Sequence, residues 1–180
     1  MSRYIFSLVL AICICSGCTS DLENQMKKFS GSRVAFDMTL TRYFGDSLDM
    51  QYRMTADSTI KFVVLYDSTE CSSCRVNTLG QYEDIRTLSN ERGEKVTPII
   101  IFSPAMGQAG ELKKELRLHE LSFPIYIDSC RNFNKINTQI PVDRRLHAVL
   151  LNRNNEVVLI GNPVNNPQLW TLYENTVKTL

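Results

Sequence analysis

The sequence of 180 residues predicts an α/β fold in which a mixed central sheet lies between helices. Two short apolar runs rich in β-branched residues, Ile60–Tyr66 and Val96–Phe102, are typical of strands buried on both faces. Helical segments alternate with these runs, so the connections cross over and the joined strands are parallel. Two further runs, Leu146–Leu151 and Glu156–Ile160, are separated only by residues 152–155 and predict an antiparallel hairpin.

The first seventeen residues have the pattern of an export signal rather than of a folded element. Arg3 precedes an almost continuously apolar stretch, Ile5–Ile14, which is short for a membrane span. Cys15-Ser16-Gly17-Cys18 then resembles a bacterial lipobox, in which small residues precede an acylated cysteine. We expect a signal peptide over residues 1–17, lipid at Cys18 and a polar tether over residues 18–31. The alternatives are a buried first helix and an uncleaved anchor.

A lipid at Cys18 would attach the protein to a membrane in the cell envelope, on the periplasmic side or at the cell surface. The charge balance gives no case for nucleic acid as a partner, because 20 Lys and Arg stand against 19 Asp and Glu. Loss of the signal removes Arg3 and no acidic residue, and leaves a neutral chain.

The remaining elements are predicted in chain order within one domain, residues 32–180. Ser32–Leu40 alternates apolar and polar residues and predicts an N-terminal strand, whereas Thr41–Thr59 shows no clear pattern. After Ile60–Tyr66, a helix begins at Ser72 and ends before Gly93. The later elements are a helix over Gly110–Leu121, a strand over Pro124–Ile127, a short helix over Ser129–Asn137 and a C-terminal helix over Pro167–Leu180.

Cysteine usage agrees with export to an oxidising compartment. Of the six cysteines, Cys13 and Cys15 leave with the signal and Cys18 carries lipid, so Cys71, Cys74 and Cys130 remain. Two of these can pair and one is left over. We expect Cys130 to be a small buried residue, and the alternative is a third redox partner.

The candidate chemistry lies at Cys71-Ser72-Ser73-Cys74, directly after a buried strand and at the start of a helix. Unsatisfied N–H groups at a helix start favour the thiolate of Cys71. The spacing places both sulfurs on one helical turn, so they can form a disulfide. Cys71 would attack a partner disulfide and Cys74 would resolve the mixed disulfide. An inert structural disulfide and half of a zinc site are the alternatives, although few further zinc ligands are present.

These features resemble the TlpA-like branch of the thioredoxin superfamily. The resemblance covers Lys61–Leu180 and rests on Phe62–Cys74, on Arg75, on the strand Phe123–Asp128 and on the hairpin. It implies a thioredoxin-like fold and a membrane-tethered, periplasm-facing thiol–disulfide oxidoreductase, with Cys71 as nucleophile and Cys74 as resolving cysteine. Exported protein thiols and disulfides would be the partners, together with a membrane electron donor. Neither a cofactor nor a metal is implied.

The sequence departs from that family at Glu70 and Leu146, and it also lacks the family's helix-kinking proline near Leu79. Glu70 replaces the usual Trp, and a carboxylate beside Cys71 opposes thiolate formation. Leu146 occupies the place of the cis-proline that pairs with substrate backbone, and a non-proline residue there is expected to be trans. His147 could stabilise a thiolate near Cys71, or could be a strand-start histidine bonded to backbone.

Three functions therefore compete. The first is thiol–disulfide exchange on exported proteins, as a reductant or isomerase. The second is a redox-inactive, lipid-anchored binding module of the same fold, which Glu70 and Leu146 favour. The third is a peroxidase of the peroxiredoxin type, but the sequence contains no P-x-x-x-T-x-x-C arrangement around Cys71.

Overall fold

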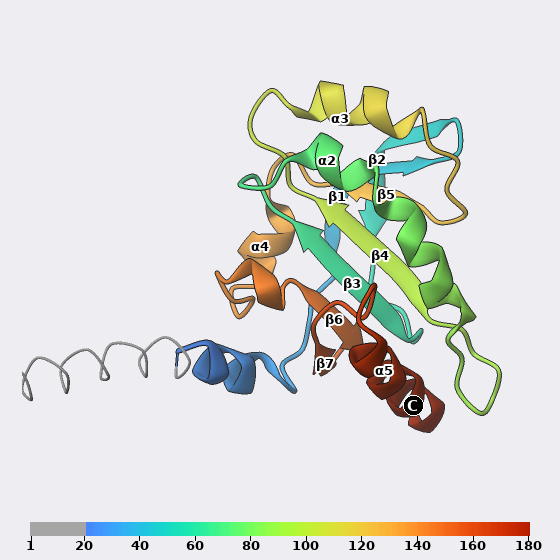
Figure 1. The fold of residues 1–180 in the computed structure, drawn as a ribbon. Helices are drawn as coiled ribbons and strands as arrows, with labels where there is room; N and C mark the ends of the chain where they lie inside the picture. Colours follow the sequence, from blue (N-terminus) through green and yellow to red (C-terminus); the bar gives the residue numbers. More distant parts are fainter. Residues whose placement is uncertain (1–20) are drawn as a thin grey trace, which may run out of the picture.

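A mixed seven-stranded sheet crosses the molecule in the order β2-β1-β5-β4-β3-β6-β7 (Figure 1). The structure is a computed structural model and describes residues 21–180, so the predicted signal peptide and lipid attachment at Cys18 lie outside the described residues. The strands are β1 (Met38–Phe44), β2 (Ser47–Met54), β3 (Lys61–Tyr66), β4 (Thr97–Phe102), β5 (Ile125–Ile127), β6 (Ala148–Leu151) and β7 (Val157–Ile160).

Helices lie on both faces of this sheet, which gives three layers (Figure 1). The α-helices are α2 (Ser72–Val76), α3 (Ala109–Leu116), α4 (Asn132–Ile136) and α5 (Pro167–Thr179), and two 3-10 helices are η1 (Leu79–Thr87) and η2 (Arg144–Leu146). Residues 21–29 are also helical. No helix in the described part of the chain is both long and apolar enough to cross a membrane.

Strand β3 lies inside the sheet, as predicted, and all six of its residues are buried. It pairs in parallel with β4 and antiparallel with β6, and β6 pairs antiparallel with β7. The central position of Ile60–Tyr66 and the C-terminal hairpin are therefore confirmed.

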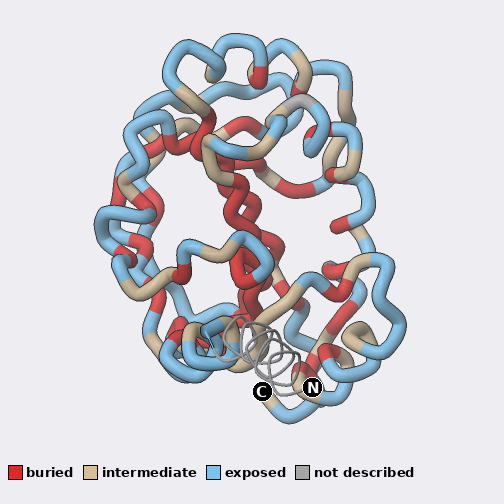
Figure 2. Tube along the Cα trace, turned by 60° about the vertical axis from the view of Figure 1, so that its left-hand side comes forward, coloured by how far each residue is buried: buried red, intermediate tan, exposed pale blue. Residues whose placement is uncertain are grey.

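Alternate residues of β3 face two separate apolar clusters. Phe62, Val64 and Tyr66 pack with residues of α2, η1, α3 and α5. Val63 and Leu65 pack with α4 and with the N-terminal segment. Buried segments accordingly run through the middle of the molecule between exposed outer segments (Figure 2). Burial on both faces explains why this strand lacks the polar alternation of a half-exposed strand.

The region with no clear sequence pattern contains a hairpin. Strands β1 and β2 pair antiparallel across a tight turn at Gly45, whose φ of +55° suits glycine. The predicted strand over Ser32–Leu40 forms ladder bonds only from Met38, although Val34 and Phe36 are buried as the alternation predicted. Before Met38 the backbone forms an isolated antiparallel bridge between Arg33 and Glu156 instead, beside which Val34 N–H donates to the carbonyl of Asn155 at 2.8 Å.

Three helices are shorter than predicted. The helix after the cysteines ends at Val76 and continues as η1, which still buries Leu79, Tyr82 and Ile85. Helix α3 ends at Leu116 rather than Leu121. Helix α4 begins only at Asn132, because Arg131 adopts a left-handed φ of 55° and interrupts the helical backbone.

The N-terminal segment joins the domain through one buried side chain. Phe29 is 2% exposed and belongs to the cluster on the α4 face. Gly31 N–H then donates to the carbonyl of Val157 at 2.8 Å. The residues predicted as a tether thus include a helix that packs through its last residue.

Candidate active site

The two cysteines lie where β3 leaves the sheet and α2 begins. Helix α2 begins at Ser72, one residue after Cys71, as predicted. Cys71 and Cys74 form a disulfide with their Cα atoms 5.3 Å apart, and both residues are exposed. The bond therefore faces solvent beyond the ends of the parallel strands β3, β4 and β5, where α2 begins (Figure 1).

Cys71 is the N-cap residue of α2. Its Sγ accepts the backbone N–H of Cys74 at 3.3 Å, and its carbonyl accepts the N–H of Arg75 at 3.1 Å. A side chain in this position satisfies a helix-start N–H that has no partner within the helix. After reduction, the same N–H would stabilise a thiolate at Cys71 more than at Cys74.

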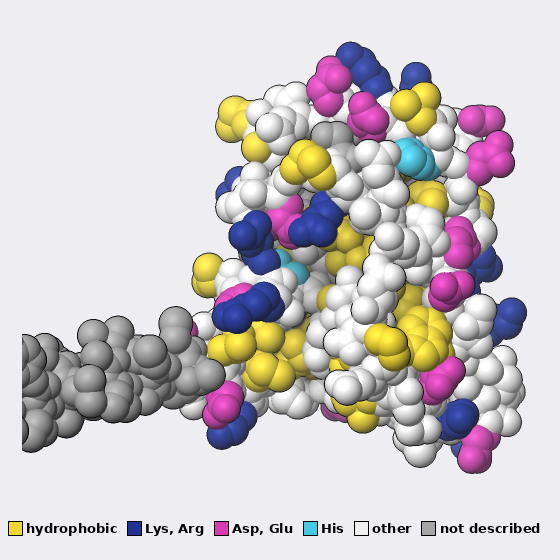
Figure 3. All heavy atoms as spheres, viewed as in Figure 1, with side chains coloured by type: hydrophobic (Ala, Val, Ile, Leu, Met, Phe, Trp, Pro, Cys, Tyr) yellow, Lys and Arg dark blue, Asp and Glu magenta, His cyan; other side chains and the backbone are white. Residues whose placement is uncertain are grey.

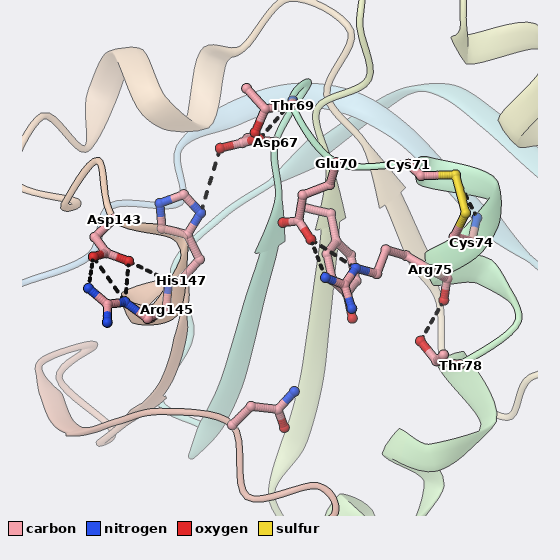
Figure 4. Close-up of polar contacts among 12 residues, drawn as sticks. Asp67, Thr69, Glu70, Cys71, Cys74, Arg75, Thr78, Asp143, Arg145 and His147 are labelled. Carbon is pink, nitrogen blue, oxygen red and sulfur yellow. Dashed lines mark hydrogen bonds and ion pairs between the residues drawn. A yellow bond between two sulfur atoms is a disulfide. The ribbon is translucent and has the colours of Figure 1, made fainter.

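Glu70 points away from the disulfide and toward Arg75 (Figure 4). Its Oε2 lies 2.8 Å from both Nε and Nη2 of Arg75. The Glu70 side chain is only 7% exposed, whereas that of Arg75 is 49% exposed and lies over the ring of Tyr66. The positive charge of Arg75 thus compensates the carboxylate beside Cys71, and the sequence alone does not indicate this contact.

A buried hydrogen-bond network continues below this ion pair. The hydroxyl groups of Tyr66 and Tyr82 lie 2.7 Å apart, and Asn162 Nδ2 donates to the Tyr82 hydroxyl at 2.9 Å. Burial raises the pKa of both tyrosines above the ordinary value, so they remain neutral. The network connects the end of β3 with η1 and with the segment after β7.

Leu146 lies in η2 rather than at the start of a strand. Its N–H donates to the carbonyl of Asp143 at 2.9 Å, and its side chain is 3% exposed. No peptide bond within residues 21–180 is cis, so the bond before Leu146 is trans, as expected.

His147 is buried beside the loop that precedes Cys71. Its Nε2 donates to the carbonyl of Pro141 at 2.8 Å, and its Nδ1 lies 4.0 Å from Oδ2 of Asp67. The ring therefore faces Asp67, on the far side of Glu70 from the disulfide (Figure 4). This geometry agrees with a histidine bonded to backbone, the second of the two expectations.

Asp67 organises the loop between β3 and Cys71. Its Oδ1 accepts the N–H and the hydroxyl of Thr69 at 2.8 and 2.6 Å. Burial acts to raise the pKa of Asp67, but these hydrogen bonds and the electrostatic effects of His147 and Arg144 together lower that pKa below its ordinary value. The Asp-x-Thr spacing is a known turn signal and could have been found in the sequence.

Cavities lie on both sides of the cysteine loop. One, of about 480 Å³, is lined by Glu70, Arg75, Arg144, His147 and others between β3 and η2. The second, of about 460 Å³, is lined by Cys71 itself and by residues of α3, including Leu112. An extended polypeptide that reaches the disulfide would lie against one or both.

Cys130 is exposed and does not form a disulfide, which corrects the expectation of a buried residue. It follows β5 in the turn before α4, where the chain leaves the sheet and the positive φ of Arg131 redirects it. Within residues 21–180, no three His, Cys, Asp or Glu side chains gather in a way that could hold a metal ion.

Comparison with known proteins finds no matching family model and no matching curated protein sequence. Solved structures do match. The thioredoxin-like superfamily protein SPOA0173 is 11% identical, with a TM-score of 0.53 over 83% of this chain and 96% of that chain. A Chlorobium tepidum protein assigned as thiol:disulfide interchange protein DsbE is 12% identical, with a TM-score of 0.52 over 82% of this chain and 99% of that one. A protein from Aquifex aeolicus VF5 assigned to electron transfer is 11% identical, with a TM-score of 0.51 over 84% and 99%. At such low identity these likenesses establish the fold alone.

Proposed function

Because this chain has a thioredoxin-like fold, we propose that it is a thiol–disulfide oxidoreductase that acts on exported proteins through Cys71 and Cys74. The observation that carries the proposal is the position of Cys71. It caps α2, its sulfur accepts the N–H of Cys74, and it is exposed and lines one cavity, while the preceding residue Glu70 lines both cavities. These are the conditions under which a thiol becomes a reactive thiolate that a client can reach.

The proposed reaction transfers two electrons to the client. The Cys71 thiolate attacks one sulfur of a client disulfide, a mixed disulfide forms, and the other client sulfur leaves as a thiolate that takes up a proton. Cys74, once deprotonated, attacks Sγ of Cys71, which forms the Cys71–Cys74 disulfide and releases the second client thiolate. A membrane partner that supplies electrons would then reduce the pair for another cycle.

Trapping of the mixed disulfide tests this function. Every variant carries Cys130→Ser, because the exposed Cys130 would otherwise form background adducts. Cys74→Ser should accumulate client adducts that a reductant releases, because the second step is blocked, whereas Cys71→Ser should accumulate none. If Cys74→Ser also traps no client from an envelope extract, the proposed activity is refuted.

The reduction potential of Cys71–Cys74 provides an independent test. A structural disulfide in an exported protein has a potential below about −300 mV, whereas a disulfide that exchanges with clients has a higher one. Equilibration with glutathione or dithiothreitol buffers, read by alkylation and mass, measures it.

The location forms part of the proposal. The apolar segment that ends at Cys18 supports lipid attachment there, and hence a protein held at the cell envelope. Intact-mass measurement of the protein from its native membrane should show a diacylated or triacylated Cys18 at the N-terminus. Unmodified Cys18 would refute the anchor and leave the redox proposal unaffected.

One observation favours a second function, a redox-inactive binding module. Turn η2 uses its own backbone donors internally, so they are not available to pair with a client strand. If a module of this kind binds clients without exchange, the double variant Cys71→Ser/Cys74→Ser will retain as many client proteins as the wild type.

A further inference from the structure

Three backbone donors of turn η2 and the residue after it already have partners within the protein. Leu146 N–H donates to the carbonyl of Asp143 at 2.9 Å, and His147 N–H donates to the carbonyl of Arg144 at 3.1 Å. Arg145 N–H donates to Oδ1 of Asp143 at 3.0 Å. Since these three donors already have partners, they do not pair with a client that lies against this turn, and side chains become more important for its recognition.

Three of the four side chains from Arg144 to His147 are already engaged. Leu146 and His147 are buried. Arg145 holds both carboxylate oxygens of Asp143, through Nε at 3.0 and 3.1 Å and through Nη2 at 2.6 Å. These hydrogen bonds lower the pKa of Asp143 to about 2, so the pair stays charged and mutually compensated.

Arg144 is the exception. It is exposed, and its guanidinium forms no hydrogen bond or ion pair with any residue in the described range 21–180. It lines the cavity of about 480 Å³ that Glu70 and Arg75 also line. Its positive charge helps to lower the pKa of Asp67, so its field extends to the loop that leads to Cys71.

The other Arg side chains around this cavity are in ion pairs. Arg75 is compensated by Glu70, and Arg145 by Asp143. His147 faces Asp67. Figure 3 shows Lys and Arg side chains beside acidic side chains over this part of the molecule. Among the described residues that line the cavity, Arg144 is therefore the guanidinium that has neither a hydrogen bond nor an ion pair and can meet a group that enters.

We propose that Arg144 selects clients that carry an acidic side chain close to the reacting cysteine. This inference rests on the proposed exchange function and names its substrate class: exported polypeptides with Asp or Glu near the cysteine. The carboxylate would pair with the guanidinium in the cavity while the client sulfur approaches Cys71. Recognition by charge takes the place of the backbone pairing that η2 prevents.

A charge-swap experiment tests the proposal. Two disulfide-bonded peptides differ only in carrying two Glu or two Lys residues beside one cysteine, and the reduced protein is mixed with each. For each protein, the readout is the second-order rate constant for the Glu peptide divided by that for the Lys peptide. This ratio is independent of differences in Cys71 reactivity between variants. Wild type should favour the Glu peptide by about two- to fivefold at low salt, and the ratio should approach one at about 1 M salt.

Variants assign the preference to one residue. Arg144→Gln should abolish the preference, and Arg144→Glu should reverse it. The control is Arg117→Glu, which makes the same charge change at the exposed end of α3, outside both cavities, and should keep the wild-type ratio.

The outcomes separate the inference from the function on which it rests. If wild type reduces both peptides and Arg144→Glu shows the wild-type ratio, the role of Arg144 is overturned while the exchange function stands. An equal shift of the ratio in Arg117→Glu would also overturn it, because net charge would then explain the preference. If wild type reduces neither peptide, the proposed function and the inference fail together.

Discussion

The carboxylate of Glu70 lies 2.8 Å from the guanidinium nitrogens of Arg75, and this ion pair joins the residue before Cys71 to the residue after Cys74. The pair therefore spans the disulfide loop. It also cancels most of the negative charge that would otherwise act on Cys71. Thiol reactivity should consequently depend on both charges rather than on Glu70 alone.

A pair of charge deletions tests this dependence. Arg75→Gln leaves Glu70 uncompensated, so the pKa of the Cys71 thiol should rise and its alkylation at pH 7 should slow about three- to tenfold. Glu70→Gln leaves the positive charge alone and should speed alkylation. The double variant should return close to wild type. Equal rates in all four proteins would show that neither charge reaches Cys71.

Reactivity of the two reduced cysteines should differ even though both are exposed. Cys71 accepts a helix-start N–H and should have the lower pKa, so iodoacetamide near neutral pH should modify Cys71 several-fold faster than Cys74. Peptide mass mapping at early times measures the ratio in the Cys130→Ser background. Faster modification of Cys74 would contradict the assignment of Cys71 as nucleophile.

The Tyr82 hydroxyl should contribute to stability. Tyr82→Phe leaves the Tyr66 hydroxyl and the Asn162 amide without their partner, and should lower the free energy of unfolding by about 1–2 kcal/mol. Urea denaturation measures the change. The double variant Tyr66→Phe/Tyr82→Phe should cost less than the sum of the two single variants, because the first substitution already removes the shared hydrogen bond.

Asp67 should make stability depend on acid. Its pKa is lower in the folded protein than its ordinary value, so its stabilising effect is complete above about pH 5 and is lost as the pH falls through the folded pKa. Asp67→Asn should be less stable than wild type at pH 6, and its urea midpoint should fall less between pH 6 and 3. Thr69→Ala, which removes one of the two hydrogen bonds from Thr69, should show part of the effect.

The sequence predicts the parts of this fold that are buried on both sides. Phe62, Val64 and their neighbours form a run with no polar interruption, and such a run between helices defines an inner strand. The position of Cys71 at the following helix start could be inferred from the same boundary. The hairpin β1–β2 was missed, although its Gly45-Asp46 turn is a hairpin signal.

The contacts of the site could not be predicted in the same way. Glu70 lies in the bend before α2 and Arg75 lies within α2, five residues later, so the i,i+3 and i,i+4 spacings of a helix do not indicate that they meet. The contact of His147 with Asp67 joins segments eighty residues apart in the chain. The use of the η2 backbone donors depends on a turn conformation that follows from the burial of Leu146 and His147.

The short span of the disulfide has a consequence for the denatured state. Cys71 and Cys74 are three positions apart, so the bond closes a very small loop and removes little chain entropy from the unfolded ensemble. The loop-closure relation gives roughly 2 kcal/mol, compared with about 4.7 kcal/mol for a loop of 100 residues. Neither cysteine belongs to the two apolar clusters on either side of the sheet. These clusters therefore contribute most of the stability of the folded state. The protein can gain or lose this bond and keep the same scaffold in both redox states.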